Sequence, residues 1–90
     1  MRFFTLPENE FLFNFLKGGC EDYYNDDFAL AYAPDADYII VTDHEQLIEL
    51  ITDEYHAQEI DDKVLDFHSL TQRSVIGNKN LVKPPFSDIT

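Results

Sequence analysis

The sequence is poor in cysteine. Its 90 residues include a single cysteine, Cys20, so the chain cannot close a disulfide on itself. A lone cysteine suits a reducing compartment, and we therefore expect a cytoplasmic protein. As a small apolar side chain, Cys20 is predicted to pack against its neighbours rather than to act as a nucleophile.

Long apolar runs are also missing. No stretch approaches the ~20 apolar residues that a membrane-spanning helix needs. The N-terminus is basic and apolar, but Glu8, Asn9 and Glu10 interrupt it. A secretion signal instead carries an unbroken apolar segment of about 7–15 residues. We therefore expect neither a membrane span nor a cleaved leader.

Positive charge is absent from half of the chain. The formal net charge is −12, and residues 18–62 hold fourteen carboxylates with no lysine or arginine among them. Residues 1–17 are balanced, and residues 63–90 carry a small positive excess. Because duplexes are held by lysine and arginine, a block of this kind repels phosphate, and direct binding of nucleic acid is disfavoured.

What the sequence does contain is the pattern of a small α+β domain. Residues 2–6 are expected to form a short N-terminal strand. A helix should follow, with Pro7 in its first turn and the glycine pair at 18–19 as its stop signal. Residues 28–33 and 38–42 flank the turn sequence PDAD, which indicates a β-hairpin.

A second helix is expected over residues 43–57. Thr42 and Glu45 have the spacing of a capping box, in which each side chain satisfies the other's free backbone N–H. The order strand, helix, hairpin, helix favours a helix packed on a small, mostly antiparallel sheet. This order is compatible with a split β-α-β arrangement.

The C-terminal third gives weaker signals. KVLDFHSL fits either a helix or a strand, and periodicity leaves both open. SVIGNKNLV indicates a small hairpin or an irregular edge segment around Gly77 and Asn78. We expect residues 1–83 to form a single compact domain and residues 84–90 to form an extended tail.

No catalytic, cofactor or metal site is predicted. His44, His56 and His68 stand twelve residues apart, which is not a local ligand spacing, and we expect them to be surface or capping side chains. The aspartates at 26–27 and 35–37 lack the pattern of a calcium loop. The glycines match no phosphate-binding fingerprint. The sequence therefore favours a protein that is not an enzyme.

A surface of one sign favours a partner of the opposite sign. Acids four residues apart on a helix lie ~5–6 Å from one another, in a row like the charges of a phosphate strand. Fourteen charges over a span of about 30 Å approach the linear charge density of duplex DNA. We therefore expect an inhibitor that occupies the basic DNA- or RNA-binding cleft of a nucleic-acid-binding protein. Phage or plasmid inhibitors of the anti-restriction or anti-CRISPR type would act in this way.

Two other interpretations stay open. One is an antitoxin or immunity-type protein against a basic toxin, and the other is an acidic domain whose charges only promote solubility. Because tyrosine is enriched at interface hot spots, the two tyrosines in the acidic loop are interface candidates, whereas Tyr38 and Tyr55 are expected to pack internally. The expected partner-binding residues are Glu21, Asp22, Tyr23, Tyr24, Asp26, Asp27, Asp35, Asp37, Glu45, Glu49, Asp53 and Glu54.

Overall fold

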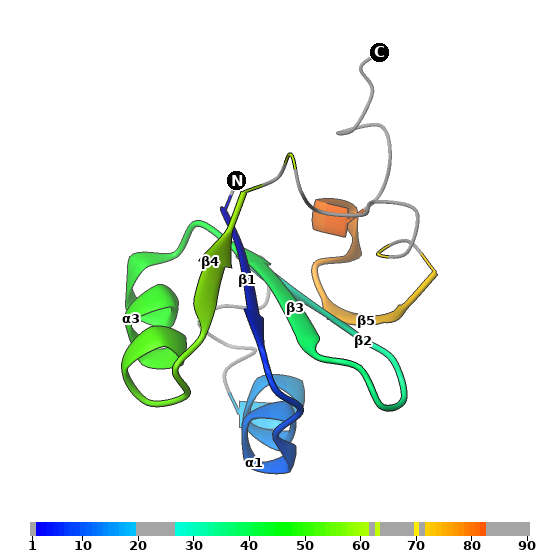
Figure 1. Cartoon of the computed structure of the whole chain (residues 1–90), viewed down its shortest axis with the longest axis horizontal. Coiled ribbons are helices and arrows are strands. Elements are labelled where there is room, and N and C mark those ends of the chain that lie inside the picture. The colour runs from blue at the N-terminus through cyan, green and yellow to red at the C-terminus, as the bar shows by residue number, and fades with distance from the viewer. Residues whose placement is uncertain (1, 20–26, 62, 64–69, 71, 83–90) are drawn as a thin grey trace.

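A five-stranded sheet organises the chain (Figure 1). The computed structural model describes residues 2–19, 27–61, 63, 70 and 72–82. The strands are β1 Arg2–Leu6, β2 Phe28–Tyr32, β3 Tyr38–Thr42, β4 Gln58–Ile60 and β5 Ser74–Gly77. Their order across the sheet is β4-β1-β3-β2-β5, and each neighbouring pair is antiparallel.

The two main helices connect strands that are not neighbours. Helix α1 (Glu10–Asn14) continues as the π-helix η1 (Phe15–Gly19), and α3 spans Glu45–Asp53. Strands β1 and β2 both pair with β3, so they run parallel with one strand between them. In the same way, β3 and β4 lie on either side of β1. These two interlocked split β-α-β units confirm the predicted α+β class.

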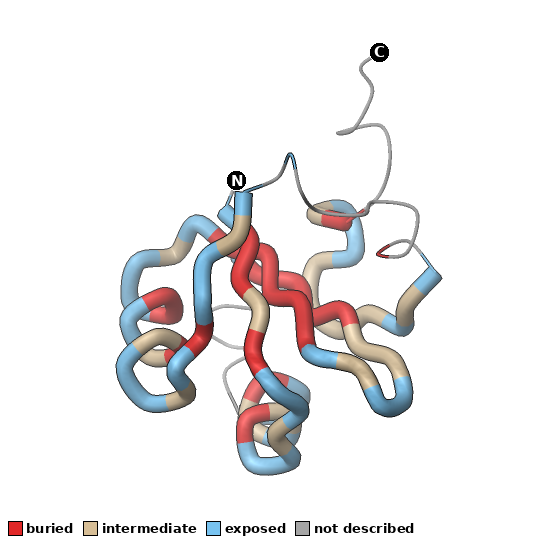
Figure 2. The backbone as a smooth tube through the Cα atoms, in the orientation of Figure 1, coloured by how far each residue is buried: buried red, intermediate tan, exposed pale blue. Residues whose placement is uncertain are grey.

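Alternating side chains divide the apolar core between the two faces of the sheet, and Figure 2 shows the buried residues running along the central strands. The face covered by α1 and α3 buries the larger cluster, Phe4, Leu6, Leu12, Leu16, Phe28, Leu30, Tyr38, Ile40, Leu47, Ile48, Ile51 and Ala57. The other face buries Phe3, Ala29, Ala31, Ile39, Val41, Leu70 and Val82. Val82 belongs to the 3-10 helix η2 (Lys79–Val82). Because β3 is covered from both sides, all five of its residues are buried.

Helix α1 begins later than the sequence pattern predicted. Pro7 lies in the connection before the helix rather than in its first turn. The N-cap is Asn9, whose Oδ1 accepts a hydrogen bond from the backbone N–H of Leu12 at 2.8 Å. Asparagine is among the preferred N-cap residues, so this local signal outweighs the proline. The helical segment ends at Gly19, as the glycine pair predicted.

The capping box predicted for α3 was wrong. Thr42 ends β3 fully buried, and its hydroxyl donates a 2.6 Å hydrogen bond to the carbonyl of Asp27. Strand pairing on both sides therefore determines the role of Thr42. The N-cap is His44 instead, and its Nδ1 accepts a 3.4 Å hydrogen bond from the backbone N–H of Leu47. This agrees with the expected capping role for a histidine.

Helix α3 also ends before the predicted residue 57. Its C-cap is Glu54, and His56 adopts a left-handed conformation with φ of 61°. The backbone N–H of Ala57 then donates to the carbonyl of Ile51 at 2.9 Å. This bond satisfies one of the free carbonyls at the helix end, and the chain turns from there into β4.

The segment around Gly77 and Asn78 lies at the sheet edge, as one of the two predicted alternatives had it, but its first part is a regular strand. The edge strand β5 ends at Gly77, and η2 follows directly, with no second strand of a hairpin in residues 72–82. Residues 64–69 lie outside the described part of the chain, so the choice of helix or strand for KVLDFHSL stays open. The expected tail at 84–90 lies outside it too.

The conformation of Gly77 predicts a large effect of adding a methyl group. Gly77 has φ of +89°, and a Cβ there would lie 2.5 Å from the carbonyl oxygen of Phe28. This oxygen already accepts a 2.7 Å hydrogen bond from the N–H of Asn78, so it cannot move away freely. Gly77→Ala is expected to lower the free energy of unfolding by about 2 kcal/mol or more.

Gly18→Ala is the matched control for this prediction. Nothing lies within 4 Å of a Cβ at Gly18, which sits in a helical segment. Alanine favours helices over glycine, so this variant should be neutral or more stable by about 0.5–1 kcal/mol. Urea denaturation of both variants measures the difference, and equal stabilities would contradict the assigned backbone conformation of Gly77.

Candidate functional site

All carboxylates that the structure describes are exposed. They include ten of the fourteen in residues 18–62. Glu21, Asp22, Asp26 and Asp62 lie outside the described residues, as do Tyr23 and Tyr24, so their predicted roles stay predictions. Because none of the described carboxylates is buried in the core, each is accessible to a partner.

Helix α3 presents a row of acids on its outer face. Leu47, Ile48 and Ile51 are buried against the sheet, whereas the acidic positions are exposed. Residues four apart on a helix share a face, with about 5–6 Å between neighbours. Glu54 follows Asp53 at the C-cap, about 100° further around the helix axis, and adds a fourth carboxylate at the end of the row. We call Glu45, Glu49, Asp53 and Glu54 the α3 acidic row.

The charges at the C-terminal end of this row oppose the helix dipole, whereas Glu45 lies in the first turn, where an anion is favourable. Cations stabilise the C-terminal end of a helix and anions destabilise it. Helix α3 nevertheless has no basic residue in its last turn, where Asp53 and then Glu54 lie. The row therefore costs stability that a lysine at either position would recover.

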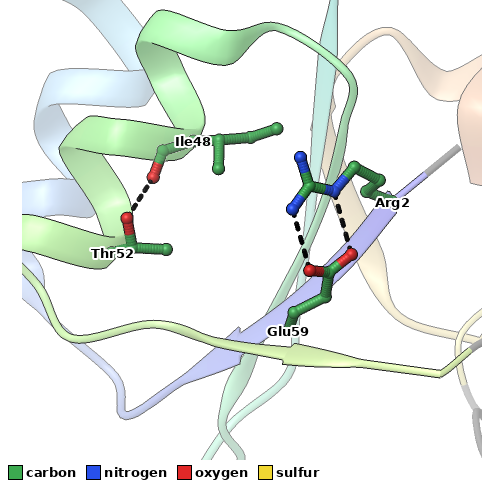
Figure 3. Close-up of polar contacts among 4 residues, drawn as sticks. All are labelled: Arg2, Ile48, Thr52 and Glu59. Atoms are coloured by element: carbon green, nitrogen blue, oxygen red, sulfur yellow. Dashed lines mark hydrogen bonds and ion pairs between the residues drawn. The ribbon is translucent and has the colours of Figure 1, made fainter.

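A distant arginine compensates one end of the acidic surface (Figure 3). Arg2 on β1 donates two hydrogen bonds to Glu59 on β4, from Nε to Oε2 at 2.9 Å and from Nη2 to Oε1 at 2.8 Å. The hydrogen bond to Glu59 raises the pKa of Arg2, and the charges of Asp43 and Glu45 raise it further. The same bond lowers the pKa of Glu59. Arg2 thus compensates one carboxylate, Glu59, of the acidic block in residues 18–62.

The remaining predicted acids separate into two places. Asp27 lies near the start of α3, because the next residue, Phe28, pairs with Thr42 at the end of β3, shortly before α3 begins. Asp35 and Asp37 lie in the β2–β3 turn, which Figure 1 shows on the other side of the molecule from α3. The seven predicted partner-binding residues that the structure describes therefore lie in two separate places.

The β2–β3 turn borders a hollow that sequence reasoning missed. The hollow has a volume of about 730 Å³, and its lining residues come from four parts of the chain: Glu8, Glu10, Phe13, Tyr32, Ala33, Pro34, Tyr38 and Ser74. We call it the aromatic hollow. Glu8 and Glu10 lie in the electrically balanced N-terminal segment of the sequence, so charge counting gave no signal. Only the topology brings them beside the turn.

Tyr38 ties the aromatic hollow together. It is buried, as predicted, and its hydroxyl donates a 3.2 Å hydrogen bond to the carbonyl of Asn9. Burial is the main cause that raises the pKa of Tyr38, and the charges of Glu8 and Glu10 add to it. Both carboxylates therefore lie close to the phenol.

An exposed aromatic pair lies beside the α3 acidic row. Phe11 is 72% exposed, and its ring stacks on that of Tyr55 with centroids 6.4 Å apart. Tyr55 is half-buried, so the expected internal packing applies to only part of its surface. Burial raises the pKa of Tyr55, and the charge of Glu54 raises it further. The pair and the acidic row are therefore neighbours.

The described residues hold no group of three histidine, cysteine, aspartate or glutamate side chains arranged for a metal ion. Of the three evenly spaced histidines, His44 caps α3, His56 is exposed in the left-handed turn, and His68 lies outside the described residues. No described helix is long and apolar enough to cross a membrane.

Comparison of the chain with models of protein families, with curated proteins and with solved structures found no match.

The contact between Arg2 and Glu59 predicts a pH-dependent stability. The pKa of Glu59 in the folded protein lies below its ordinary value of 4.5. The contact therefore stabilises the fold above that value, and this contribution is lost as the pH falls through the folded pKa. Arg2→Gln should lower the free energy of unfolding near neutral pH and have progressively less effect on acidification.

Lys79→Gln provides the control, because it removes the same charge from an exposed position in η2. Urea denaturation of the three proteins across a pH series measures both differences. A gap between the unchanged protein and Arg2→Gln that stays constant with pH, or that Lys79→Gln reproduces, would contradict the proposed linkage.

Proposed function

We propose that this protein is a small inhibitor that binds a basic nucleic-acid-binding protein and occupies the cleft that would otherwise hold DNA or RNA. The observation that carries the proposal is the α3 acidic row, in which the exposed carboxylates of Glu45, Glu49 and Asp53 follow one another along one face of a helix. Such a row offers a basic cleft regularly spaced anions, as a phosphate strand does.

The support beneath the row favours this use. Leu47 and Ile51 are fully buried in the core that α3 shares with the sheet. The carboxylates are therefore carried on a helix whose position is already set before a partner arrives. A preorganised surface loses less conformational entropy on binding, and a concentrated negative field steers a basic partner toward it.

The arrangement of charge along α3 favours a function over a purely solubilising role. Glu45 and Glu49, and Glu49 and Asp53, are like-charged pairs at helical spacing, and each pair is destabilising. Asp53 and Glu54 also oppose the helix dipole. A solubilising surface does not need these costs, because a lysine at one of these positions would stabilise the helix and still leave the chain with a large net negative charge.

The Phe11–Tyr55 pair supplies the second element of an interface. Charges bring a partner into register, but most binding energy at interfaces comes from a few aromatic and arginine side chains. An exposed phenylalanine stacked on a half-buried tyrosine beside Glu54 is suited to this anchoring role. The proposed contact surface is therefore the α3 acidic row together with Phe11 and Tyr55.

The charge of the α3 acidic row favours a class of partner, proteins with a cationic cleft, rather than one particular protein. A restriction enzyme, a CRISPR effector and a basic toxin with nuclease activity all present a cationic cleft of this kind. The anti-restriction or anti-CRISPR type of inhibitor and the antitoxin type thus belong to one proposal that differs only in the partner. In each case the interaction should weaken steeply with salt.

Affinity capture with charge-matched variants tests this function. Glu49→Gln with Asp53→Asn removes two charges from α3, and Asp35→Asn with Asp37→Asn removes two from the β2–β3 turn. All four positions are exposed, so both variants should keep the fold, which circular dichroism checks. The immobilised proteins are used to capture nucleic-acid-binding proteins from cell lysate at low salt, and bound protein is eluted with salt or duplex DNA.

The α3 variant is expected to bind its partner about tenfold more weakly, and the turn variant should bind as the unchanged protein does. Duplex DNA should displace the partner, because both compete for one cleft. If both variants lost the same amount of affinity, binding would depend on net charge rather than on the position of the acids on α3, and the proposed contact surface would be wrong. A partner that resists both salt and DNA would contradict the proposal.

A further inference from the structure

The aromatic hollow is a separate concave site, away from α3. Its volume of about 730 Å³ falls within the range of ligand pockets, roughly 300–1,000 Å³. The β1–α1 connection, α1, the β2–β3 hairpin and β5 each contribute to its wall. No lysine or arginine is found among the described residues that line it. Its chemistry is that of carboxylates and aromatic rings.

The rings of the hollow are held in place by one another. Phe13 meets Tyr32 nearly edge-on, with centroids 4.9 Å apart and planes at 87°, and it lies 6.2 Å from Tyr38 at 40°. The hydrogen bond from Tyr38 to Asn9 fixes the segment between Glu8 and Glu10 against the hairpin. The result is a corner of aromatic faces and edges with two carboxylates beside it.

This combination recognises one class of ligand. Aromatic faces attract ammonium and guanidinium groups, and carboxylates pair with the same groups. An anion would be repelled by Glu8 and Glu10, and a purely apolar ligand would desolvate them without replacing their hydrogen bonds. A cation with an organic body satisfies both the rings and the acids.

One neighbouring cation of the chain, Lys17, agrees with this chemistry. The Lys17 ammonium lies 5.8 Å from the centroid of the Phe13 ring, within the range of a cation–π contact. Lys17 is not among the residues that line the hollow. Arg73 precedes Ser74 but directs its guanidinium to the carbonyl of Asp37. One ring of the site thus already attracts an ammonium group, and neither cation lines the hollow.

We propose that the aromatic hollow binds an organic cation, with its ammonium or guanidinium group against Phe13 and Tyr32 and paired with Glu8 and Glu10. The cation belongs either to a free small molecule or to a basic side chain within a polypeptide segment. This site is distinct from the α3 acidic row and does not depend on the function proposed above.

Ligand titration of the full chain by NMR tests the proposal. N-acetylarginine amide carries the guanidinium group, and N-acetylcitrulline amide is its uncharged counterpart of nearly the same shape. Signals of Phe13, Tyr32 and Ser74 should shift saturably with the arginine compound and not with the citrulline compound. Tetramethylammonium chloride, a cation with no N–H donors, should shift the aromatic signals in the same sense.

A pentapeptide with one central arginine distinguishes the two sources of the cation. Tighter binding of the peptide than of the amide identifies a polypeptide ligand, since the hollow would then contact the flanking backbone. Equal binding identifies a free small molecule. Absence of saturable shifts with all three cationic probes would overturn the proposal.

Charge-matched variants locate the effect. Glu8→Gln with Glu10→Gln should weaken binding of N-acetylarginine amide about three- to tenfold, and Tyr32→Leu about threefold. Glu49→Gln with Asp53→Asn removes the same charge from α3 and should leave this affinity unchanged. Equal weakening by the two double variants, or equal shifts with the citrulline compound, would overturn a specific cation site.

Discussion

Strand β3 is the element on which the other positions depend. It pairs with β1 on one side and β2 on the other, and it is buried beneath helices on one face and beneath Leu70 and η2 on the other. Its last residue, Thr42, donates to the carbonyl of Asp27 and accepts from the N–H of His44. One buried hydroxyl thereby joins the end of β3 to the start of β2 and to the cap of α3. At the other end of β3, the turn carries Asp35 and Asp37, so the strand holds two acidic regions apart.

Much of the fold follows from local sequence patterns. RFFTL, FALAY and YIIVT are rich in aromatic and β-branched residues, and all three form strands where expected. The apolar spacing of α3 also predicted its buried face. The helix start was mispredicted for a tertiary reason. Thr42 has the local signal of a cap, but pairing with Arg2 and Phe28 extends the strand through it. Local propensity cannot reveal such competition.

The candidate sites divide in the same way. The exposed row on α3 could be anticipated, because acids four apart fall opposite a buried stripe at helical spacing. The hydrogen bonds between Arg2 and Glu59 join residues 57 positions apart, which are brought together because β1 pairs with β4. The aromatic hollow likewise unites Glu8 with Ser74 across most of the chain. Charge counting along a sequence sees neither contact, because both arise from strand order.

The outer strands of the sheet also limit how another molecule can attach. β4 has three residues and β5 has four, and β5 ends at a glycine whose left-handed backbone breaks the extended conformation. Strand addition by a partner requires a longer, regular row of free amides and carbonyls. The margins of this sheet provide only brief backbone templates. A partner should therefore recognise this protein through its side chains rather than by backbone pairing at a sheet edge. Point substitutions on the surface should then change the specificity of binding.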